Sequence, residues 1–457
     1  MTDPTLLWLR RDLRLSDHAA LIAAASEGPV IPVYILDDDT AKHRKMGGAS
    51  RWWLHHSLTA LDKQLHAKGA RLILRRGVAA DVLAELADQT GAKRVHCLRH
   101  YEPWWRNAER AVAQTLELVC HDGNYLSPPG TITSGSGQPY KIYTPFWRAL
   151  NEQMPPAPPQ PAPHAIAAPA RWPESDTLAD WKLLPTKPDW APGFVKEWTP
   201  GEHAAHERLA DFLPHAAGYD IGRNLPSDEL TSRLSPHLHF GEISPATVWH
   251  AVLAAKGDAT TYLKEIAWRD YAQNVIQQYP DYGRENGRPN LDTLAWRSGA
   301  QADADLKAWQ QGRTGYPIVD AGMRQLWTSG WMHNRVRMIT ASFLIKHLLI
   351  DWRRGEDWFW DCLVDADYGS NTVNWQWTAG TGIDANMFSR IMAPLTQSAK
   401  FDAAGYIRAW VPELADLSDE AIHDPDEFGR RPKNYPAKII GHREGRERAL
   451  AAMKRTR

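Results

Sequence analysis

The chain has 457 residues, of which 43% are hydrophobic and 23% charged, proportions typical of a globular protein. One hydrophobic core rarely serves so long a chain, so two or three domains are expected. The net charge of −1 excludes a strongly basic or acidic protein. No run of 18 apolar residues and no apolar leader is present, so neither a membrane span nor a signal peptide is predicted.

Three cysteines, Cys97, Cys120 and Cys362, match no spacing typical of a metal site. The 19 histidines form no HExxH motif and no Cys/His cluster, so no metal is expected. Low cysteine use predicts a cytoplasmic protein. Tryptophan is unusually frequent, with 22 residues. Beyond filling a core, so many indoles suggest stacking on flat rings or relaying electrons.

Residues 1–130 alternate short apolar runs with helical patterns, which predicts an α/β domain with a Rossmann-like, doubly wound parallel sheet. Ser50 is the expected N-cap of the helix over residues 50–69. Neither a GxGxxG motif nor a P-loop is present, so a standard dinucleotide or NTP site is not supported. The expected strands cover residues 5–10, 30–36, 71–75, 94–98 and 116–120.

Residues 131–200 include "MPPAPPQPAPHAIAAPARWP" and are expected to form a Pro-rich interdomain linker. From residue 201 to 457 the apolar spacing is helical, which predicts an all-α domain. The last 30 residues hold ten Lys/Arg and two Asp/Glu. This basic tail is typical of a solvated helix, and it is also compatible with holding a polyanion.

Polar residues recur on helical faces that the pattern predicts to be buried. In "KEIAWRDYAQN", Glu265, Trp268 and Arg269 fall at positions i, i+3 and i+4 of one face. In "WTSGWMHNRVRMIT", residues 327–340, one helix is expected, with Asn334 and Met338 one turn apart. Each set alone has a structural explanation, as a surface ion pair or a buried amide. Buried polar groups otherwise need partners, which a ligand would supply.

Two further segments are polar. In "DADYGSNTVNWQW", Asp365, Asp367 and Asn371 form either a capped turn or a ring-binding set. In "TSRLS", hydroxyls stand at an expected helix start, which indicates either an N-cap or a phosphate site. Taken together, the four segments suit a large, flat cofactor that carries phosphates, with tryptophans stacking nearby.

The chain resembles the DNA photolyase/cryptochrome family, and most closely the bacterial photolyases that repair cyclobutane pyrimidine dimers. The resemblance begins with "LLWLRRDLRLSDHAAL" and "IPVYILD" and continues through "TSRLSPHLHFGEIS" and "KEIAWRDYAQ". It is most specific over residues 312–356 and closes with "DADYGSNTVNWQWTAGTGIDA" and "LTQSAKFD". It implies an antenna-chromophore domain at residues 1–130 and a helical FAD-binding catalytic domain at residues 201–457.

Within that resemblance, the matched motif positions imply the FAD site. Arg269 is expected to pair with a carboxylate near the flavin, and Asn371 to face flavin N5. The implied FAD-contacting residues are Tyr219, Thr231, Ser232, Leu234, Ser235, Arg269, Asn334, Asp365, Asp367 and Asn371.

The resemblance also implies a substrate and a mechanism. Light excites reduced FAD (FADH−), which passes one electron to a dimer flipped out of DNA. Glu265 is expected to stabilise the thymine radical anion. The expected lesion and DNA contacts, which include phosphate contacts without sequence preference, are Arg223, Glu265, Trp268, Asn334, Met338, Trp377 and Gln397.

A second implied function is re-reduction of oxidised flavin from the surface. Trp375, Trp352 and an outer tryptophan, for which Trp296 is the candidate, resemble the family's electron-relay chain. The antenna is expected to be methenyltetrahydrofolate, with a deazaflavin or no antenna as the alternatives. "HYEPWWRNAER" supplies its expected contacts, Glu102, Trp104 and Trp105.

Three alternatives to a monomeric cyclobutane-dimer photolyase acting on UV-damaged DNA remain. A cryptochrome-type blue-light receptor would bind FAD without repair, and the set Glu265, Asn334 and Met338 argues against it. A six-four photoproduct photolyase is opposed by the missing pair of pocket histidines. A light-independent flavoprotein would leave the tryptophan chain and the Arg/Gln surface without a role.

Overall fold

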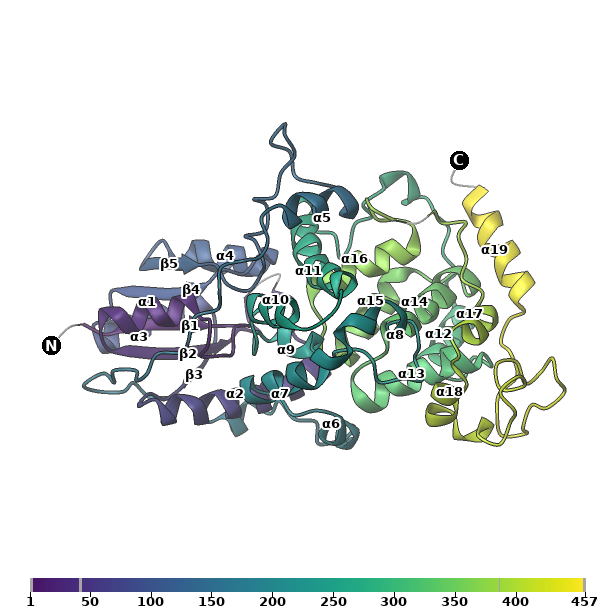
Figure 1. Ribbon diagram of the computed structural model, residues 1–457, viewed down its shortest axis with the longest axis horizontal. Helices are drawn as coiled ribbons and strands as arrows, with labels where there is room; N and C mark the ends of the chain where they lie inside the picture. The colour runs from purple at the N-terminus through teal and green to yellow at the C-terminus, as the bar shows by residue number, and fades with distance from the viewer. Residues whose placement is uncertain (1–2, 41–42, 386, 455–457) are drawn as a thin grey trace. The chain divides into compact units, whose positions relative to one another are not determined.

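A computed structural model describes residues 3–40, 43–385 and 387–454 (Figure 1). The chain forms two compact units. The first comprises residues 1–189, 198–216 and 232–280, and the second residues 190–197, 217–231 and 281–457. No helix among the described residues is long and apolar enough to span a membrane.

A five-stranded parallel sheet is the centre of the first unit, as predicted. Its strands are β1 (Thr5–Leu9), β2 (Val30–Leu36), β3 (Ile73–Arg76), β4 (Arg94–Leu98) and β5 (Glu117–His121). The order β3-β2-β1-β4-β5 reverses direction between β1 and β4, which makes the sheet doubly wound. β1 and β2 are buried along their whole length, which explains why their sequences are almost continuously apolar.

Helices connect the successive parallel strands. They are α1 (Ala19–Glu27), α2 (Gly48–Ala67), α3 (Ala79–Thr90) and α4 (Pro103–Val112). α1 packs against β1, β4 and β5, and α3 packs against α4 (Figure 1). The expected cap of α2 is wrong: Gly47 is the N-cap, and Ser50 lies buried inside the first turn. The helix therefore begins two residues earlier than its expected start.

The remaining regular elements of the first unit are helices joined by irregular segments. Its elements are α5 (Tyr143–Asn151), η1 (Leu178–Trp181), α7 (Glu202–Phe212), α9 (Ser235–His239), α10 (Pro245–Ala254) and α11 (Thr260–Gln278). A 3₁₀ turn, η2 (Leu213–Gly218), follows α7. The expected linker over residues 131–200 thus contains α5 and η1, and also α6 of the second unit. The compact units do not follow the residue 130 and 200 boundaries, which remain a prediction.

The second unit is all-α among the described residues. Its elements are α6 (Pro192–Glu197), α8 (Tyr219–Gly222), η3 (Pro289–Leu291), α12 (Ala300–Gln310), α13 (Pro317–Ser329), α14 (Asn334–Ser342), η4 (Phe343–His347), α15 (Trp352–Cys362), α16 (Tyr368–Ala379), α17 (Pro394–Lys400), α18 (Ala404–Trp410), η5 (Pro412–Leu414) and α19 (His442–Lys454). The predicted helical character of this half is confirmed, and four of the ten basic residues of the tail lie on α19.

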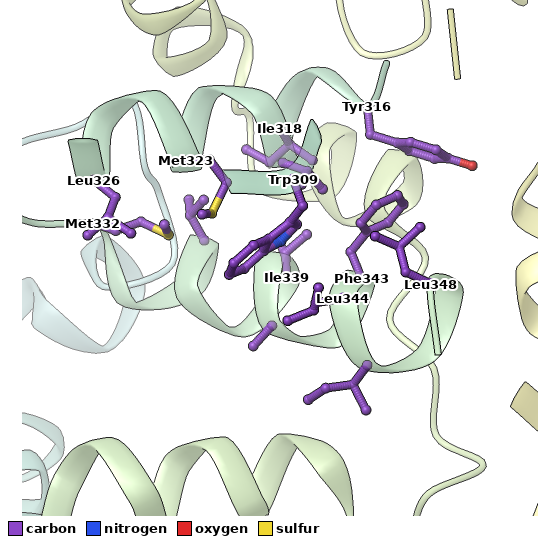
Figure 2. Close-up of a cluster of buried hydrophobic side chains, with 14 of the residues drawn as sticks. Trp309, Tyr316, Ile318, Met323, Leu326, Met332, Ile339, Phe343, Leu344 and Leu348 are labelled. Carbon is purple, nitrogen blue, oxygen red and sulfur yellow. The ribbon is translucent and has the colours of Figure 1, made fainter. Parts of the chain in front are cut away.

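One apolar core holds the second unit together (Figure 2). Trp309 lies between α13 and the continuous run of α14 and η4, and its indole nitrogen donates to the Thr340 carbonyl at 3.0 Å. Met323 and Ile339 approach it from either side in Figure 2. A fully buried tryptophan with a satisfied N–H stabilises such a core strongly, because the ring removes a large apolar area from water.

Candidate functional site

A pocket of about 500 Å³ opens in the second unit. Arg335, Arg390 and Lys400 give it positive charge, and no carboxylate lines it among the described residues. A cationic pocket that also offers apolar surface suits an anionic ligand with a flat, weakly polar part. The lining residues are Asn224, Arg335, Met338, Trp377, Arg390, Ile391, Met392, Gln397, Lys400 and Phe401.

Three of these residues, Met338, Trp377 and Gln397, were predicted from the sequence as substrate contacts, and the structure brings them together. The remaining seven were missed. Two of them had a local signal: Arg335 precedes Met338 by three residues, and Lys400 follows Gln397 by three residues on α17. Asn224 and the other residues from Arg390 to Phe401 come from distant segments that carry no periodic pattern.

The predicted continuous helix over residues 327–340 is wrong. α13 ends at Ser329, and Gly330 follows with a left-handed φ of 69°. A Cβ at Gly330 would lie 2.6 Å from Phe194 and 2.7 Å from Val364. Residues 331–333 are not helical, and α14 begins afresh at Asn334. A glycine inside an otherwise helical pattern therefore marks the end of one helix and not a tolerated interior position.

The break changes which polar residues are buried. Asn334, the first residue of α14, is exposed, and Arg335 and Arg337 are half-buried. His333 is the buried one; it caps the helix by accepting from the Arg335 N–H. Burial, assisted by nearby Arg335 and Arg337, lowers the pKa of His333 to about 4. His333 is therefore neutral at pH 7 and supplies no cationic imidazole.

Arg335 contacts three other residues of the pocket lining. Its guanidinium donates to the Asn224 side-chain oxygen and lies 3.8 Å from the sulfur of Met338. The same group stacks 4.6 Å from the ring centre of Phe401, over which Lys400 also lies at 5.3 Å. Cation–π contacts of this kind hold both cations near the pocket while leaving their charge available to an anion.

An ion pair and an amide network lie on neighbouring helices of the same unit. Both terminal guanidinium nitrogens of Arg337 donate to Asp365, at 3.1 and 2.9 Å. The Asn371 amide donates to the side chain of Glu356 at 2.8 Å and to its carbonyl at 3.2 Å. Because its N–H groups are used in this way, the Asn371 oxygen is the part left to meet a ligand donor.

Asp367 has a structural function as well as its predicted one. It is the N-cap of α16, and its carboxylate accepts from the Ser370 N–H at 2.7 Å. The capping explanation is therefore confirmed for Asp367, whereas a ring-binding function of this segment stays a prediction; Asp365 is paired with Arg337. Capping fixes the start of α16, the helix that carries Asn371 and Trp375.

The predicted electron-relay tryptophans lie in the second unit. Trp375 and Trp352 are buried, and Trp296 is half-buried. A Cβ on Gly355 would lie 2.2 Å from the Trp375 ring, so α15 and α16 approach closely at this glycine. Trp375 also meets Trp309 edge-on at 6.3 Å between ring centres, a neighbour that the sequence did not single out. Trp296 packs beside Phe388 at 6.4 Å, and its place in a relay remains a prediction.

Helix α11 of the first unit carries Glu265, Trp268 and Arg269 on one face, as their spacing predicted, and all three are half-buried. Within this unit Arg269 donates to the Leu238 carbonyl at 3.1 Å and not to a carboxylate. Its other terminal nitrogen and the Trp268 indole nitrogen are buried and meet no acceptor among the described residues. Two such orphaned donors indicate a surface that a ligand completes.

The predicted phosphate-binding residues are divided between the units. Tyr219, Arg223 and Thr231 belong to the second, and Ser232 to the first. Arg223 lies 5.6 Å from the Tyr219 ring centre. The expected N-cap near Ser235 is wrong, because Leu234 is the cap and no side chain makes the capping bond. Helix capping therefore does not explain these hydroxyls. The other explanation, a ligand-binding function for Ser232 and Ser235, stays a prediction.

The predicted antenna residues follow β4, at the carboxyl edge of the sheet where its strand order reverses. Doubly wound sheets bind ligands at this point. Glu102 is fully buried and forms an ion pair with Arg11. The Trp104 ring stacks with His43 at 5.8 Å, and the Trp105 ring meets Trp8 edge-on at 6.3 Å.

Comparison with known proteins decides the family. Residues 5–164 match the family model described as DNA photolyase, and residues 262–455 match the FAD binding domain of DNA photolyase. A deoxyribodipyrimidine photo-lyase of Agrobacterium fabrum is 48% identical over 99% of this chain and 98% of its own. The chain belongs to the DNA photolyase family.

Solved structures of the photolyase family confirm the fold. A bacterial class III photolyase from Agrobacterium tumefaciens superposes with a TM-score of 0.95 and 47% identity, covering 100% of this chain and 98% of the other. Cryptochrome-1 of Arabidopsis thaliana is 34% identical over 98% of this chain and 70% of its own length. The predicted α/β domain followed by a helical FAD-binding domain is thus confirmed.

Proposed function

We propose that this photolyase repairs cyclobutane pyrimidine dimers in DNA by light-driven electron transfer from reduced FAD. The observation that carries the proposal is the pocket, whose lining combines three cations with the apolar surface of Met338 and Trp377. The cations match DNA phosphates, and the apolar surface matches the faces of two fused pyrimidines. High similarity along the whole chain to a deoxyribodipyrimidine photo-lyase supports the same activity.

The residues of the site fit FAD. Within the second unit, the Arg337–Asp365 pair and the Asn371–Glu356 network are fixed polar groups suited to a flavin's ring edge. Within the first unit, Arg269 has an N–H that meets no acceptor among the described residues. Bound FAD supplies the photoexcited electron donor, which no amino acid side chain provides. The proposed FAD contacts are Tyr219, Thr231, Ser232, Leu234, Ser235, Arg269, Asn334, Asp365, Asp367 and Asn371.

The side chains of the protein are proposed to bind the lesion and the phosphates beside it. Asn334, exposed at the start of α14, is proposed to donate its amide to a pyrimidine carbonyl. Glu265 is proposed to bond the pyrimidine edge, and Trp268 to pack beside the lesion. Arg223 and Gln397 are proposed to hold phosphates on either side of the flipped nucleotides. Because these contacts depend on the shape of the lesion and on phosphate charge, we expect DNA binding without sequence preference.

Two rival functions are less well supported. A six-four photolyase is expected to use two pocket histidines, yet no histidine lines the described pocket, and nearby His333 is neutral and serves as a helix cap. A cryptochrome-type receptor is the second rival, since Cryptochrome-1 is also similar, although this chain is more similar to the Agrobacterium photo-lyase.

An antenna chromophore is the remaining part of the proposal. Methenyltetrahydrofolate, with a deazaflavin as the alternative, is proposed to lie near Trp104 and Trp105, whose rings stand at the reversal of strand order. Glu102 is already paired with Arg11, so a chromophore contact there requires sharing that carboxylate. Spectra of the purified protein distinguish a folate from a deazaflavin by their absorption.

Repair is tested directly. The flavin of the purified protein is reduced, oligo-dT carrying cyclobutane dimers is added, and intact thymines are counted in light and in darkness. We expect dimer loss in light alone. The variant Glu265→Ala should lower the yield while FAD stays bound. No dimer loss by the illuminated wild type contradicts the proposal, and FAD loss in the variant makes Glu265 structural.

A further inference from the structure

Two cysteines face each other across the edge of the sheet. Cys97 of β4 and Cys120 of β5 are direct partners in the strand register, and their sulfur atoms lie 3.6 Å apart. Neighbouring strands run about 4.8 Å apart, within the range of about 4.4–6.8 Å that separates the Cα atoms of a disulfide. The strand register and the separation of the sulfurs are therefore compatible with a disulfide between these two positions.

The surroundings distinguish the two thiols. Cys97 is buried, whereas Cys120 is half-buried on the edge strand. A hydrogen bond from Cys97 lowers the pKa of Cys120, and the Arg99 and Arg10 guanidinium groups favour its thiolate further. The same interaction raises the pKa of Cys97. Cys120 is thus the more accessible and more nucleophilic partner, with Cys97 behind it as the resolving thiol.

A metal site is the competing explanation, because Glu109 lies near both sulfurs. Its carboxylate, however, already accepts from Arg10 at 2.9 Å, from the His100 N–H at 3.2 Å and from Arg106 at 2.9 Å. A buried guanidinium at this distance repels a divalent cation, and all the oxygens of the carboxylate are engaged. The arrangement therefore favours chemistry between the two sulfurs.

We propose that Cys97 and Cys120 form a reversible disulfide when the protein meets a peroxide. The Cys120 thiolate attacks hydrogen peroxide, so the O–O bond breaks, hydroxide leaves and a sulfenic acid forms. The Cys97 sulfur then attacks the Cys120 sulfur, and the sulfenic oxygen leaves as water with the Cys97 proton. In total, two thiols and one peroxide give one disulfide and two waters. A dithiol reductant reverses the change.

The disulfide would link the edge strand β5 covalently to β4. β5 pairs with β4 alone among the described strands. The loop directly after it accepts hydrogen bonds from two buried side chains: the Tyr101 hydroxyl donates to Asp122, and Arg14 donates to Gly123 and Asn124. A covalent link two residues before this loop restrains it, and also spares Cys120 from irreversible oxidation.

The test treats the purified, FAD-bound protein with hydrogen peroxide and counts thiols after denaturation. The reduced chain has three. We expect one, that of Cys362, with full return of all three after dithiothreitol, and a peptide linking residues 97 and 120 by mass spectrometry. The oxidised protein should also melt at a higher temperature, and the shift should vanish in Cys97→Ser. Three surviving thiols, or cysteine sulfonic acid without the link, would overturn the proposal.

Matched variants separate the functions of the two thiols. Cys97→Ser should accumulate a sulfenic acid that dimedone labels at Cys120, whereas Cys120→Ser should leave Cys97 largely unlabelled. Cys362→Ser, which alters a buried thiol of the second unit, should oxidise like the wild type. Equal labelling of both single variants, or zinc that is retained through dialysis and blocks oxidation, contradicts the assignment.

Discussion

Arg337 meets Asp365 with two parallel hydrogen bonds, which join α14 to the segment just before α16. The carboxylate side chain is 4% exposed, and the guanidinium side chain 22%. A planar fork matches a carboxylate in a way that an ammonium group does not. The pair therefore fixes the relation between the helix that begins with Asn334 and the helix that carries Asn371.

The first prediction concerns this pair. Arg337→Lys retains the charge but loses the fork, so we expect the free energy of unfolding to fall by about 1–3 kcal/mol. The fraction of bound FAD should fall with it, because Asp365 then turns freely. Urea unfolding and the ratio of flavin to protein absorbance measure the two effects. Arg443→Lys is the matched control, since its pair with Glu447 is largely exposed and worth about 0–1 kcal/mol. Equal losses in both variants would show that the fork is unimportant.

The second prediction concerns DNA binding. Lys400→Ala removes one cation from the pocket wall, so damaged DNA should bind more weakly. The slope of log affinity against log salt should fall by about 0.7–0.9, the value for one phosphate contact. Lys307→Ala, on the exposed side of α12, is the control and should leave the slope unchanged. An unaltered slope in Lys400→Ala would remove Lys400 from the DNA surface.

The third prediction separates re-reduction from repair. Trp375→Phe should block photoreduction of oxidised flavin, because phenylalanine is far harder to oxidise than tryptophan. Repair by protein whose flavin was reduced chemically should persist. Transient absorption and dimer counting provide the two measurements. Trp327→Phe, at a ring that is 46% exposed, serves as the control. Normal photoreduction in Trp375→Phe would mean that another route, such as one through neighbouring Trp309, is sufficient.

The fourth prediction concerns Lys346. Its amine is buried and donates to the carbonyls of Ala379 and Phe388, at 3.0 and 2.8 Å. Burial lowers the pKa of this amine to about 7, whereas the pKa of a lysine in an unfolded chain is about 10.4. Between these values the unfolded chain binds the extra proton, so stability rises with pH across this window, by at most about 1.4 kcal/mol per pH unit.

Lys346→Met should abolish that part of the rise, because methionine does not titrate. Urea unfolding at pH 7 and pH 9 measures the gain, and exposed Lys307→Met controls for the loss of a lysine charge elsewhere. If Lys346→Met gains as much stability as the wild type between these values, the amine is not the group responsible.

The sheet could be predicted because its chemistry is local. Buried parallel strands are continuous apolar runs, and helices of ordinary length separate them. The spacing of Glu265, Trp268 and Arg269 likewise places them on one helical face, which α11 confirms. These features depend on residues within a few positions of each other, which is the range over which a sequence pattern is informative.

The pocket could be predicted only in part, because it depends on distant segments. Arg335 joins Asn224, which lies 111 residues earlier, and Phe401 comes from the region after α17. The break at Gly330 was missed because Trp327 and Trp331, one helical turn apart, imitate a continuous helix. The local signal was Gly330 itself, a usual residue at a helix end, and the nearby Phe194 and Val364 leave no room for a side chain there.

Gly330 makes the orientation of α14 depend on a residue that has no side chain. Its left-handed backbone and the nearby Phe194 and Val364 leave no room for a methyl group, so even alanine forces the chain to move. Asn334, Arg335 and Met338 would all turn together with such a movement. We therefore expect mutational sensitivity to extend beyond the residues proposed to contact DNA, and a screen limited to the pocket lining would miss Gly330.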